Sequence, residues 1–171
     1  ATTEIYTLSL HDALRSSSTL IREALSQGRL DYANQMLGYN YTLVGKVVPG
    51  NQIGRKIGFP TANIRVNAAE KIIPAVGVYA VLLRYQGMDY QAMMNVGYRP
   101  TIKEKVKSLF LEVHIPNHDL ELYDAEVELK FLKRIRDEKQ FDSLEDLTTQ
   151  LKMDKDFIIQ YFNTNFVDSK K

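Results

Sequence analysis

AEVELKFLKR, residues 125–134, is the stretch that decides the fold class, because its side chains alternate between apolar and polar from Ala125 to Phe131. Residues 126–131 read EVELKF, with an apolar side chain at each second position. A period of two is typical of a β-strand that buries one face and exposes the other. The segment therefore predicts a strand on the surface of a sheet or barrel.

Further strands are predicted on the N-terminal side of this one. YTLVGKVV (41–48) alternates and is β-branched, and LFLEVHI (109–115) has the same character. GVYAVLLRY (77–85) and DYQAMMNV (89–96) are separated by a short connection with Gly87, which predicts a hairpin. About five or six strands without alternating helices favour an antiparallel barrel.

Helical spacing of apolar residues flanks this strand-rich region. Residues 19–37 predict two short helices, interrupted at Gly28 and closed by Gly38. After Phe141 a helix is expected with Ser143 as N-cap and a stripe of leucines at 144, 147 and 151. Asp154 is expected to begin a further turn or separate helix, and the chain from Asn163 onward to fray.

Composition excludes several classes of function. The 171 residues carry 22 basic and 21 acidic side chains, so the net charge of +1 gives no field that would gather nucleic acid or anionic lipid. There is no cysteine, which removes disulfides and thiolate sites and fits the cytoplasm. Apolar runs are too short for a membrane helix. We expect one globular domain with an appendage, without nucleic-acid or membrane partners.

The segment GRKIGFPTAN, residues 54–63, is the first candidate site. Gly54 and Gly58 would let the backbone approach an anionic ligand, and Thr61 and Asn63 offer neutral oxygens of the kind that Mg²⁺ accepts. The segment is not a common P-loop, and a glycine- and proline-rich connection between strands can equally be a plain loop.

Glu112 is the second candidate, in the strand LFLEVHI. Alternation places Phe110, Glu112 and His114 on one face and the aliphatic residues on the other. A carboxylate beside a substrate hydroxyl can accept its proton during phosphoryl transfer, although a solvated strand face explains the pattern as well. NVGYRPT (95–101) and Arg136 are weaker candidates, since Arg136 can pair either with phosphate or with Asp137 or Glu138.

Taken in order, these motifs resemble those of the riboflavin kinase family. The resemblance covers about residues 41–151 and is carried by GRKIGFPTAN, GVYAV, MNVGYRPT, LEVHI, LY and IRDEKQF. It implies a mainly β fold: a six-stranded antiparallel Greek-key barrel with a C-terminal helix and, here, a short N-terminal helical segment. It also implies transfer of the γ-phosphoryl group of MgATP to the ribityl 5′-hydroxyl of riboflavin, giving FMN and ADP.

The resemblance assigns roles to individual residues. Glu112 would be the general base, and Thr61 and Asn63 would contact Mg²⁺ and the ATP phosphates. The nucleotide would be bound by Gly54, Arg55, Lys56, Gly58, Phe59, Pro60, Thr61 and Asn63. The flavin would be bound by Asn95, Gly97, Arg99, Pro100, Thr101, His114 and Arg136. Asp124 and the loop IKEKVKS (102–108) depart from the family pattern.

Upstream, SSSTLIREALSQGRLDYANQMLGY (16–39) resembles the end of an FMN adenylyltransferase module. Ser17, Ser18, Thr19 and Arg22 match its ISSTxIR-like signature, whereas the remainder of that module is missing. We therefore predict a remnant with a non-family N-terminus over 1–39, a kinase domain over 40–165 and a tail over 166–171. The native chain is expected to be fused to the full module. The alternatives are a non-catalytic flavin- or nucleotide-binding barrel and a truncated FAD synthetase that lacks adenylyltransferase activity.

Overall fold

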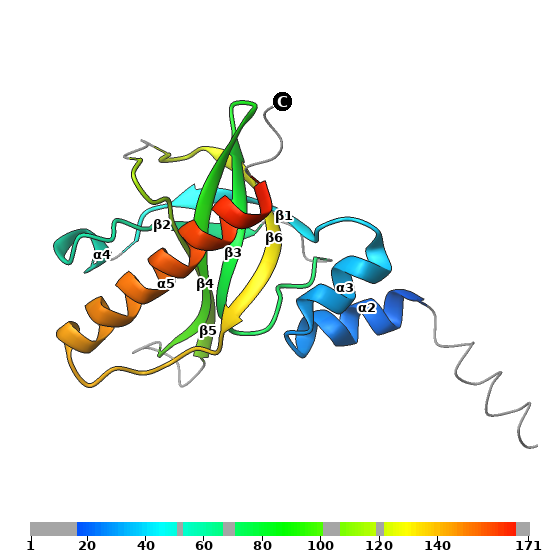
Figure 1. Ribbon diagram of the computed structural model, residues 1–171, viewed down its shortest axis with the longest axis horizontal. Helices are drawn as coiled ribbons and strands as arrows, with labels where there is room; N and C mark the ends of the chain where they lie inside the picture. The colour runs from blue at the N-terminus through cyan, green and yellow to red at the C-terminus, as the bar shows by residue number, and fades with distance from the viewer. Residues whose placement is uncertain (1–16, 51–52, 67–70, 101–106, 119–121, 167–171) are drawn as a thin grey trace, which may run out of the picture.

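The computed structural model describes residues 17–50, 53–66, 71–100, 107–118 and 122–166. Its strands form a closed barrel in which all neighbouring strands are antiparallel, in the order β1-β2-β5-β4-β3-β6 (Figure 1). The strands are β1 (Thr42–Val48), β2 (Ala62–Val66), β3 (Gly77–Tyr85), β4 (Met88–Pro100), β5 (Lys107–His114) and β6 (Glu126–Arg136). Because β2 returns to lie beside β5, strands β2 to β5 form a Greek key. The predicted architecture is confirmed.

The hairpin of β3 and β4 is closed by the turn predicted around Gly87. Gln86 and Gly87 both have positive φ angles, 50° and 78°, and Tyr85 lies opposite Met88. Two-residue turns of this kind match the right-handed twist of the flanking strands. The turn therefore fixes the register of the longest strand pair in the barrel.

Two N-terminal helices, α2 (Ser17–Ser26) and α3 (Leu30–Leu37), share the core of the barrel. Their buried residues Ala24, Leu25, Leu30 and Ala33 belong to the same apolar cluster as the inward-facing residues of the strands. The Ala75 amide donates to the Leu25 carbonyl over 2.9 Å. Figure 1 shows this helix pair beside the barrel, on the side away from α4. The predicted helices are confirmed, and the domain boundary after residue 39 stays a prediction.

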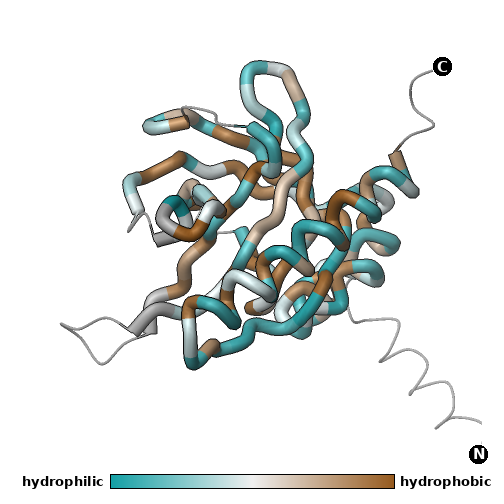
Figure 2. The backbone as a smooth tube through the Cα atoms, turned by 60° about the vertical axis from the view of Figure 1, so that its left-hand side comes forward, coloured by the Kyte–Doolittle hydropathy of each residue, from teal (hydrophilic) through white to brown (hydrophobic). Residues whose placement is uncertain are grey.

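The helix α5 (Leu144–Phe166) covers the outer face of β3 and β4. A second apolar cluster joins Ile158 and Phe162 of the helix to Val78, Ala80, Met93 and Leu132 of the barrel. Polar and apolar stretches alternate along the helix (Figure 2). The Ser143 Oγ accepts a hydrogen bond from the Asp146 amide over 3.0 Å, as an N-cap does, which confirms that predicted start.

Two predictions about this helix are wrong. Asp154 begins no separate helix, because it lies buried in the middle of one continuous helix and binds Arg136. The helix continues through Asn163 to Phe166. Of the three leucines in the predicted stripe, Leu144 is exposed, whereas Leu147 and Leu151 are half-buried. Within the described part of the chain, we find no helix of the length and apolarity that a membrane crossing requires.

Candidate functional site

A single row of opposed residues runs around the barrel and contains the main candidates. Each member lies directly opposite the next across neighbouring strands; in order they are Val48, Asn63, Glu112, Asn95, Val78 and Arg136. Opposed residues point to the same face of a sheet. Val78 packs beneath α5, so this face is the outer one. The register thus gathers residues that are far apart in the sequence.

Four members of the row, Glu112, Asn95, Val78 and Arg136, form part of the floor of a cavity of about 290 Å³ between the barrel and α5, which we call the side cavity. Its apolar walls are Ile57, Phe59, Val78, Met93, Phe110, Phe141, Leu147 and Leu151. Its polar groups come from Thr61, Asn95, Glu112, His114, Arg136, Glu138, Lys139 and Asp154, and the Gly54 backbone completes it. The volume is near the lower end of the roughly 300–1,000 Å³ typical of ligand sites.

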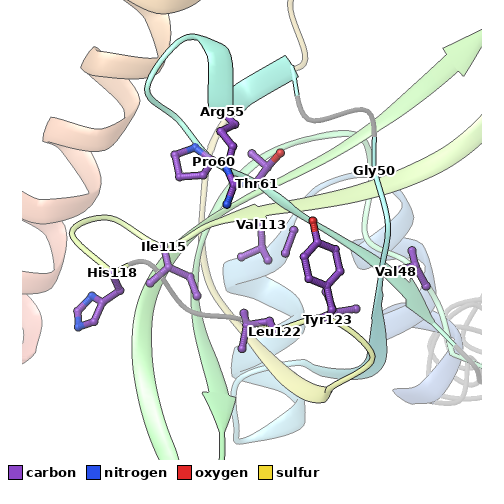
Figure 3. Close-up of a pocket in the computed structure, with 12 residues that line it drawn as sticks. Val48, Gly50, Arg55, Pro60, Thr61, Val113, Ile115, His118, Leu122 and Tyr123 are labelled. Atoms are coloured by element: carbon purple, nitrogen blue, oxygen red, sulfur yellow. The ribbon is translucent and has the colours of Figure 1, made fainter.

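A smaller space of about 90 Å³, the mouth pocket, lies where β1 and β5 end and β2 begins. Its apolar wall includes Val47, Val48, Val113, Ile115 and Leu122. In Figure 3, Arg55 and Thr61 lie on one side, Tyr123 lies across from them, and His118 points away from the other labelled side chains. Residues 51–52 and 119–121, which lie next to these segments in sequence, fall outside the described residues.

Thr61 lines both the side cavity and the mouth pocket. Asn63, two residues later, lies opposite Glu112, and its side chain occupies the space where a Cβ at Gly50 would lie. Gly50 in turn lines the mouth pocket. Thr61 therefore lies at the boundary between the two spaces, Asn63 lies beside the mouth pocket at Gly50, and Glu112 lies in the side cavity.

His114 presents a defined hydrogen-bond acceptor to the side cavity. Its side chain is 5% exposed, and its Nδ1 lies 2.8 Å from the Pro60 carbonyl oxygen. Because a carbonyl can only accept, Nδ1 is the donor. Burial lowers the pKa of His114 below 6.5, which the hydrogen bond to Pro60 only partly offsets. The ring is therefore neutral at pH 7, and Nε2 carries the lone pair.

Arg136 is held by a carboxylate that the sequence did not indicate. Its Nη2 lies 2.6 Å from Asp154 Oδ2, its Nε bonds the same carboxylate, and Asp154 is 2% exposed. Gln150 donates to Asp154 Oδ1 over 2.9 Å. The expected ion pair with Asp137 or Glu138 is wrong. Arg136 pairs with Asp154 instead, and its hydrogen bond to Asp137 goes to the backbone carbonyl of that residue. This ion pair fastens α5 to the end of β6, at the wall of the side cavity.

The predicted glycines have local structural reasons. A Cβ at Gly54 would overlap the Phe59 carbonyl oxygen, and Gly58 has a φ of 81° that favours glycine. A Cβ at Gly97 would overlap Glu138 and meet the Phe110 ring at 2.8 Å. The connection between β1 and β2 is not only a plain loop, because it contains one short helix, α4 (Ile53–Lys56), after which the Gly54 carbonyl accepts hydrogen bonds from the Ile57 and Phe59 amides.

The remaining predicted residues divide into three groups. Arg55 and Pro60 line the mouth pocket, whereas Phe59 lines the side cavity and lies 5.2 Å from the His114 ring, measured between centroids. Arg99 and Pro100 belong to β4 and Lys56 to α4. Thr101 lies outside the described residues.

Sequence reasoning missed several lining residues. Three of them lie on faces that the sequence pattern already indicated: Phe110 on the strand face of Glu112, and Leu147 and Leu151 on the leucine stripe of the last helix. A search along those faces would have found them. Tyr123 belonged to the quoted LY motif but received no role. Asp154 carried no local signal, because its partner is 18 residues earlier in the chain.

Comparison with known proteins places the chain in a family. The model of the flavokinase family, described as riboflavin kinase, matches residues 37–162. Bifunctional riboflavin kinase/FMN adenylyltransferases are similar: that of Listeria monocytogenes is 45% identical over 81% of this chain and 44% of its own length. That of Bacillus subtilis is 40% identical over 86% of this chain and 46% of its own. The chain thus spans less than half the length of these relatives.

Solved structures agree with the architecture. A chain described as a macrolide-efflux protein from Streptococcus pneumoniae superimposes with a TM-score of 0.77 and 37% identity, covering 83% of this chain and 46% of that one. Riboflavin kinase from Trypanosoma brucei gives a TM-score of 0.51 at 24% identity, covering 72% of this chain and 80% of that one, and shares the fold. From the family match and these identities, the chain belongs to the riboflavin kinase family.

Proposed function

We propose that this chain transfers the γ-phosphoryl group of MgATP to the ribityl 5′-hydroxyl of riboflavin, giving FMN and ADP. The observation that carries this proposal is that Thr61 lines two separate spaces, with Glu112 in one of them. An enzyme that joins two substrates needs two sites that meet at the reacting atoms. The family membership supports the choice of substrates.

The side cavity suits a flavin, because apolar and aromatic walls surround a polar floor. The mouth pocket offers the Arg55 side chain for phosphates and an apolar wall that ends at Tyr123. We assign the flavin to the side cavity and the nucleotide to the mouth pocket, so that the 5′-hydroxyl and the γ-phosphate meet near Thr61.

The reaction balances without a further reactant. The 5′-oxygen of riboflavin forms a bond to the γ-phosphorus as the bond to the β,γ-bridging oxygen breaks, and ADP leaves with that electron pair. Glu112 accepts the proton of the hydroxyl. Its position on a barrel strand between Asn63 and Asn95 holds the carboxylate toward the cavity, so positioning supplies much of the effect.

Thr61 and Asn63 fit a hard cation. Thr61 lies at the boundary of the two spaces and Asn63 lies beside Gly50 of the mouth pocket. Mg²⁺ commonly keeps waters and substrate phosphates as its other ligands, so two neutral protein oxygens would be enough. Bound there, Mg²⁺ would neutralise charge that develops on the phosphates. By analogy with the bifunctional relatives, we also propose that the native chain carries an FMN adenylyltransferase module.

The decisive experiment incubates the chain with riboflavin, ATP and MgCl₂ and measures FMN, FAD and ADP by chromatography. We expect equal amounts of FMN and ADP and no FAD. Glu112→Gln is expected to lower turnover by about 10² to 10⁴-fold while riboflavin still binds, because the shape of the side chain is kept and its basicity is lost. Glu145→Gln, on the exposed first turn of α5, is the matched control.

Two results would contradict the proposal in different ways. FMN formation by Glu112→Gln at the wild-type rate would remove Glu112 as the base. Binding of riboflavin and nucleotide without any FMN would identify the chain as a non-catalytic binding barrel.

A further inference from the structure

The segment between α4 and β2 is attached to the rest of the molecule at both of its ends. At the first end, the Phe59 amide donates to the Gly54 carbonyl over 2.8 Å. At the other end, β2 begins at Ala62 and pairs with β5. Pro60 and Thr61 lie between these attachments, at the mouth pocket (Figure 3). The position of the Thr61 hydroxyl therefore depends on what fixes these two residues.

A histidine on the neighbouring strand supplies a third attachment between the two ends. His114 is the last residue of β5, and its Nδ1 donates to the Pro60 carbonyl oxygen over 2.8 Å. Its ring also lies against Phe59, with 5.2 Å between the ring centroids. The His114 side chain is buried, so its ring is held by its surroundings and offers Nδ1 in one direction.

Backbone geometry transmits this attachment to Thr61. The proline ring fixes φ of Pro60 at about −65°, which leaves ψ as the only soft torsion before the next peptide group. That peptide group is planar and contains both the Pro60 carbonyl oxygen and the Thr61 amide. A hydrogen bond that holds the oxygen thus sets the plane of the peptide, and with it the position of the Thr61 Cα.

We propose that His114 is a positioning residue for the transfer reaction: through Nδ1 and the Pro60 carbonyl, it holds Thr61 where the hydroxyl can contact MgATP. This inference rests on the proposed function. It separates the two ring nitrogens, since a hydrogen bond to the flavin would come from Nε2, which is buried and has no partner among the described residues. The positioning role belongs to Nδ1 alone.

Two substitutions separate these roles, because they keep different parts of the ring. His114→Phe keeps an aromatic ring against Phe59 and removes the Nδ1 donor. His114→Asn places an amide nitrogen near the position of Nδ1, so it restores the donor although it lacks Nε2. Tyr41→Phe is the matched control, because it removes a 2.7 Å hydrogen bond from a side chain to the Ile72 carbonyl, away from both linings.

We expect His114→Phe to raise the KM for MgATP about fivefold, as the loss of one hydrogen bond predicts, and His114→Asn to restore the wild-type value. Any change in the KM for riboflavin should be the same in both variants, because both lack Nε2. Tyr41→Phe should change neither KM. FMN formation at varied MgATP and at varied riboflavin gives these values. Titration calorimetry with MgAMP-PNP, a non-hydrolysable analogue of MgATP, measures nucleotide binding separately.

A double-mutant cycle tests whether His114 acts through Thr61. In the Thr61→Val background, His114→Phe should raise the KM for MgATP by less than about twofold, because the hydroxyl that His114 positions is already absent. A contribution of His114 to the fold in general would instead multiply the two separate effects. It would also weaken both substrates to the same degree and lower the melting temperature.

Two results would overturn this inference and leave the kinase proposal standing: equal KM values for MgATP in His114→Phe and His114→Asn, or effects that multiply in the cycle. If His114→Phe does not fold, His114→Gln, whose amide extends beyond the position of Nδ1, replaces it in both tests. Failure of both variants to fold would overturn the positioning role as well. Absence of FMN formation by the wild type would overturn the proposed function, and the titrations with MgAMP-PNP would still decide the role of His114.

Discussion

The side cavity and the mouth pocket meet at Thr61, yet they are built from opposite faces of the same strand. Val113 and Ile115 of the β5 segment face inward and line the mouth pocket, whereas Glu112 and His114 face outward and line the side cavity. Inward residues pack at core density and leave about 90 Å³. The outward face leaves about 290 Å³ because α5 covers it as a separate layer. The larger site therefore depends on what holds its cover.

The largest expected difference between the two spaces comes from loosening α5, the helix that covers the side cavity. Asp154→Ala leaves the guanidinium of Arg136 buried without its carboxylate, and we expect a loss of about 3–5 kcal/mol in the free energy of unfolding. The KM for riboflavin should rise, and nucleotide binding in the mouth pocket should change little. Urea unfolding and separate titrations of the two substrates measure these effects.

Two further variants sharpen that result. Asp156→Ala, an exposed position on the same helix, is the control and should leave both measurements unchanged. The double variant Arg136→Met with Asp154→Leu should recover most of the stability, since an apolar pair can replace a buried ion pair. If Asp154→Ala unfolds at the wild-type urea concentration, the ion pair does not hold the cover.

A smaller effect is expected at the wall that the two spaces share. Thr61→Val keeps the shape of the side chain and removes its hydroxyl, so the KM for MgATP should rise about 10-fold, as the loss of one hydrogen bond to a charged ligand predicts. Asn63→Ala should act in the same direction. Steady-state kinetics at varied MgATP test this.

Thr148→Ala is the matched control, since its hydroxyl bonds the Leu144 carbonyl within α5, away from the wall. Unchanged kinetics for MgATP in Thr61→Val and Asn63→Ala would remove both residues from the proposed metal site.

The smallest expected effect lies at the N-terminus of α5. Ser143→Ala removes the N-cap of α5 and should lower the free energy of unfolding by about 1 kcal/mol. Because the capped turn lies outside both linings, the KM of each substrate should stay within about twofold of the wild-type value. A thermal melt, followed by kinetics at varied riboflavin and at varied MgATP, distinguishes this outcome from damage to the side cavity.

The sequence predicted those parts of the molecule that depend on local pattern. The period-two strand at 126–131, the turn at Gly87 and the cap at Ser143 were found because each is specified by neighbouring residues. Asp154 was misread, because a carboxylate within an apolar helix looks like a helix start until Arg136 is placed against it.

The sequence identified individual residues of the candidate site, but it did not predict how they are arranged in space. Alternation placed Glu112 and His114 on one face, which the side cavity confirms. The alignment of Asn63, Glu112 and Asn95 depends on the register between three strands, and the pattern of a single strand contains no information about it. The existence of the side cavity likewise depends on where α5 lies. The family resemblance supplied roles that the residue pattern left open.

The strand order also determines how this molecule can be assembled. The last strand along the chain, β6, lies between β1 and β3, and Thr42 at the start of β1 is opposite Lys130. Barrel closure thus requires contact between residues distant in sequence, a feature of chains that fold in milliseconds to seconds. During synthesis β3, β4 and β5 can pair early, whereas β1 gains its second neighbour only when β6 has left the ribosome. The core that supports the side cavity and the mouth pocket is therefore completed late, by the final strand.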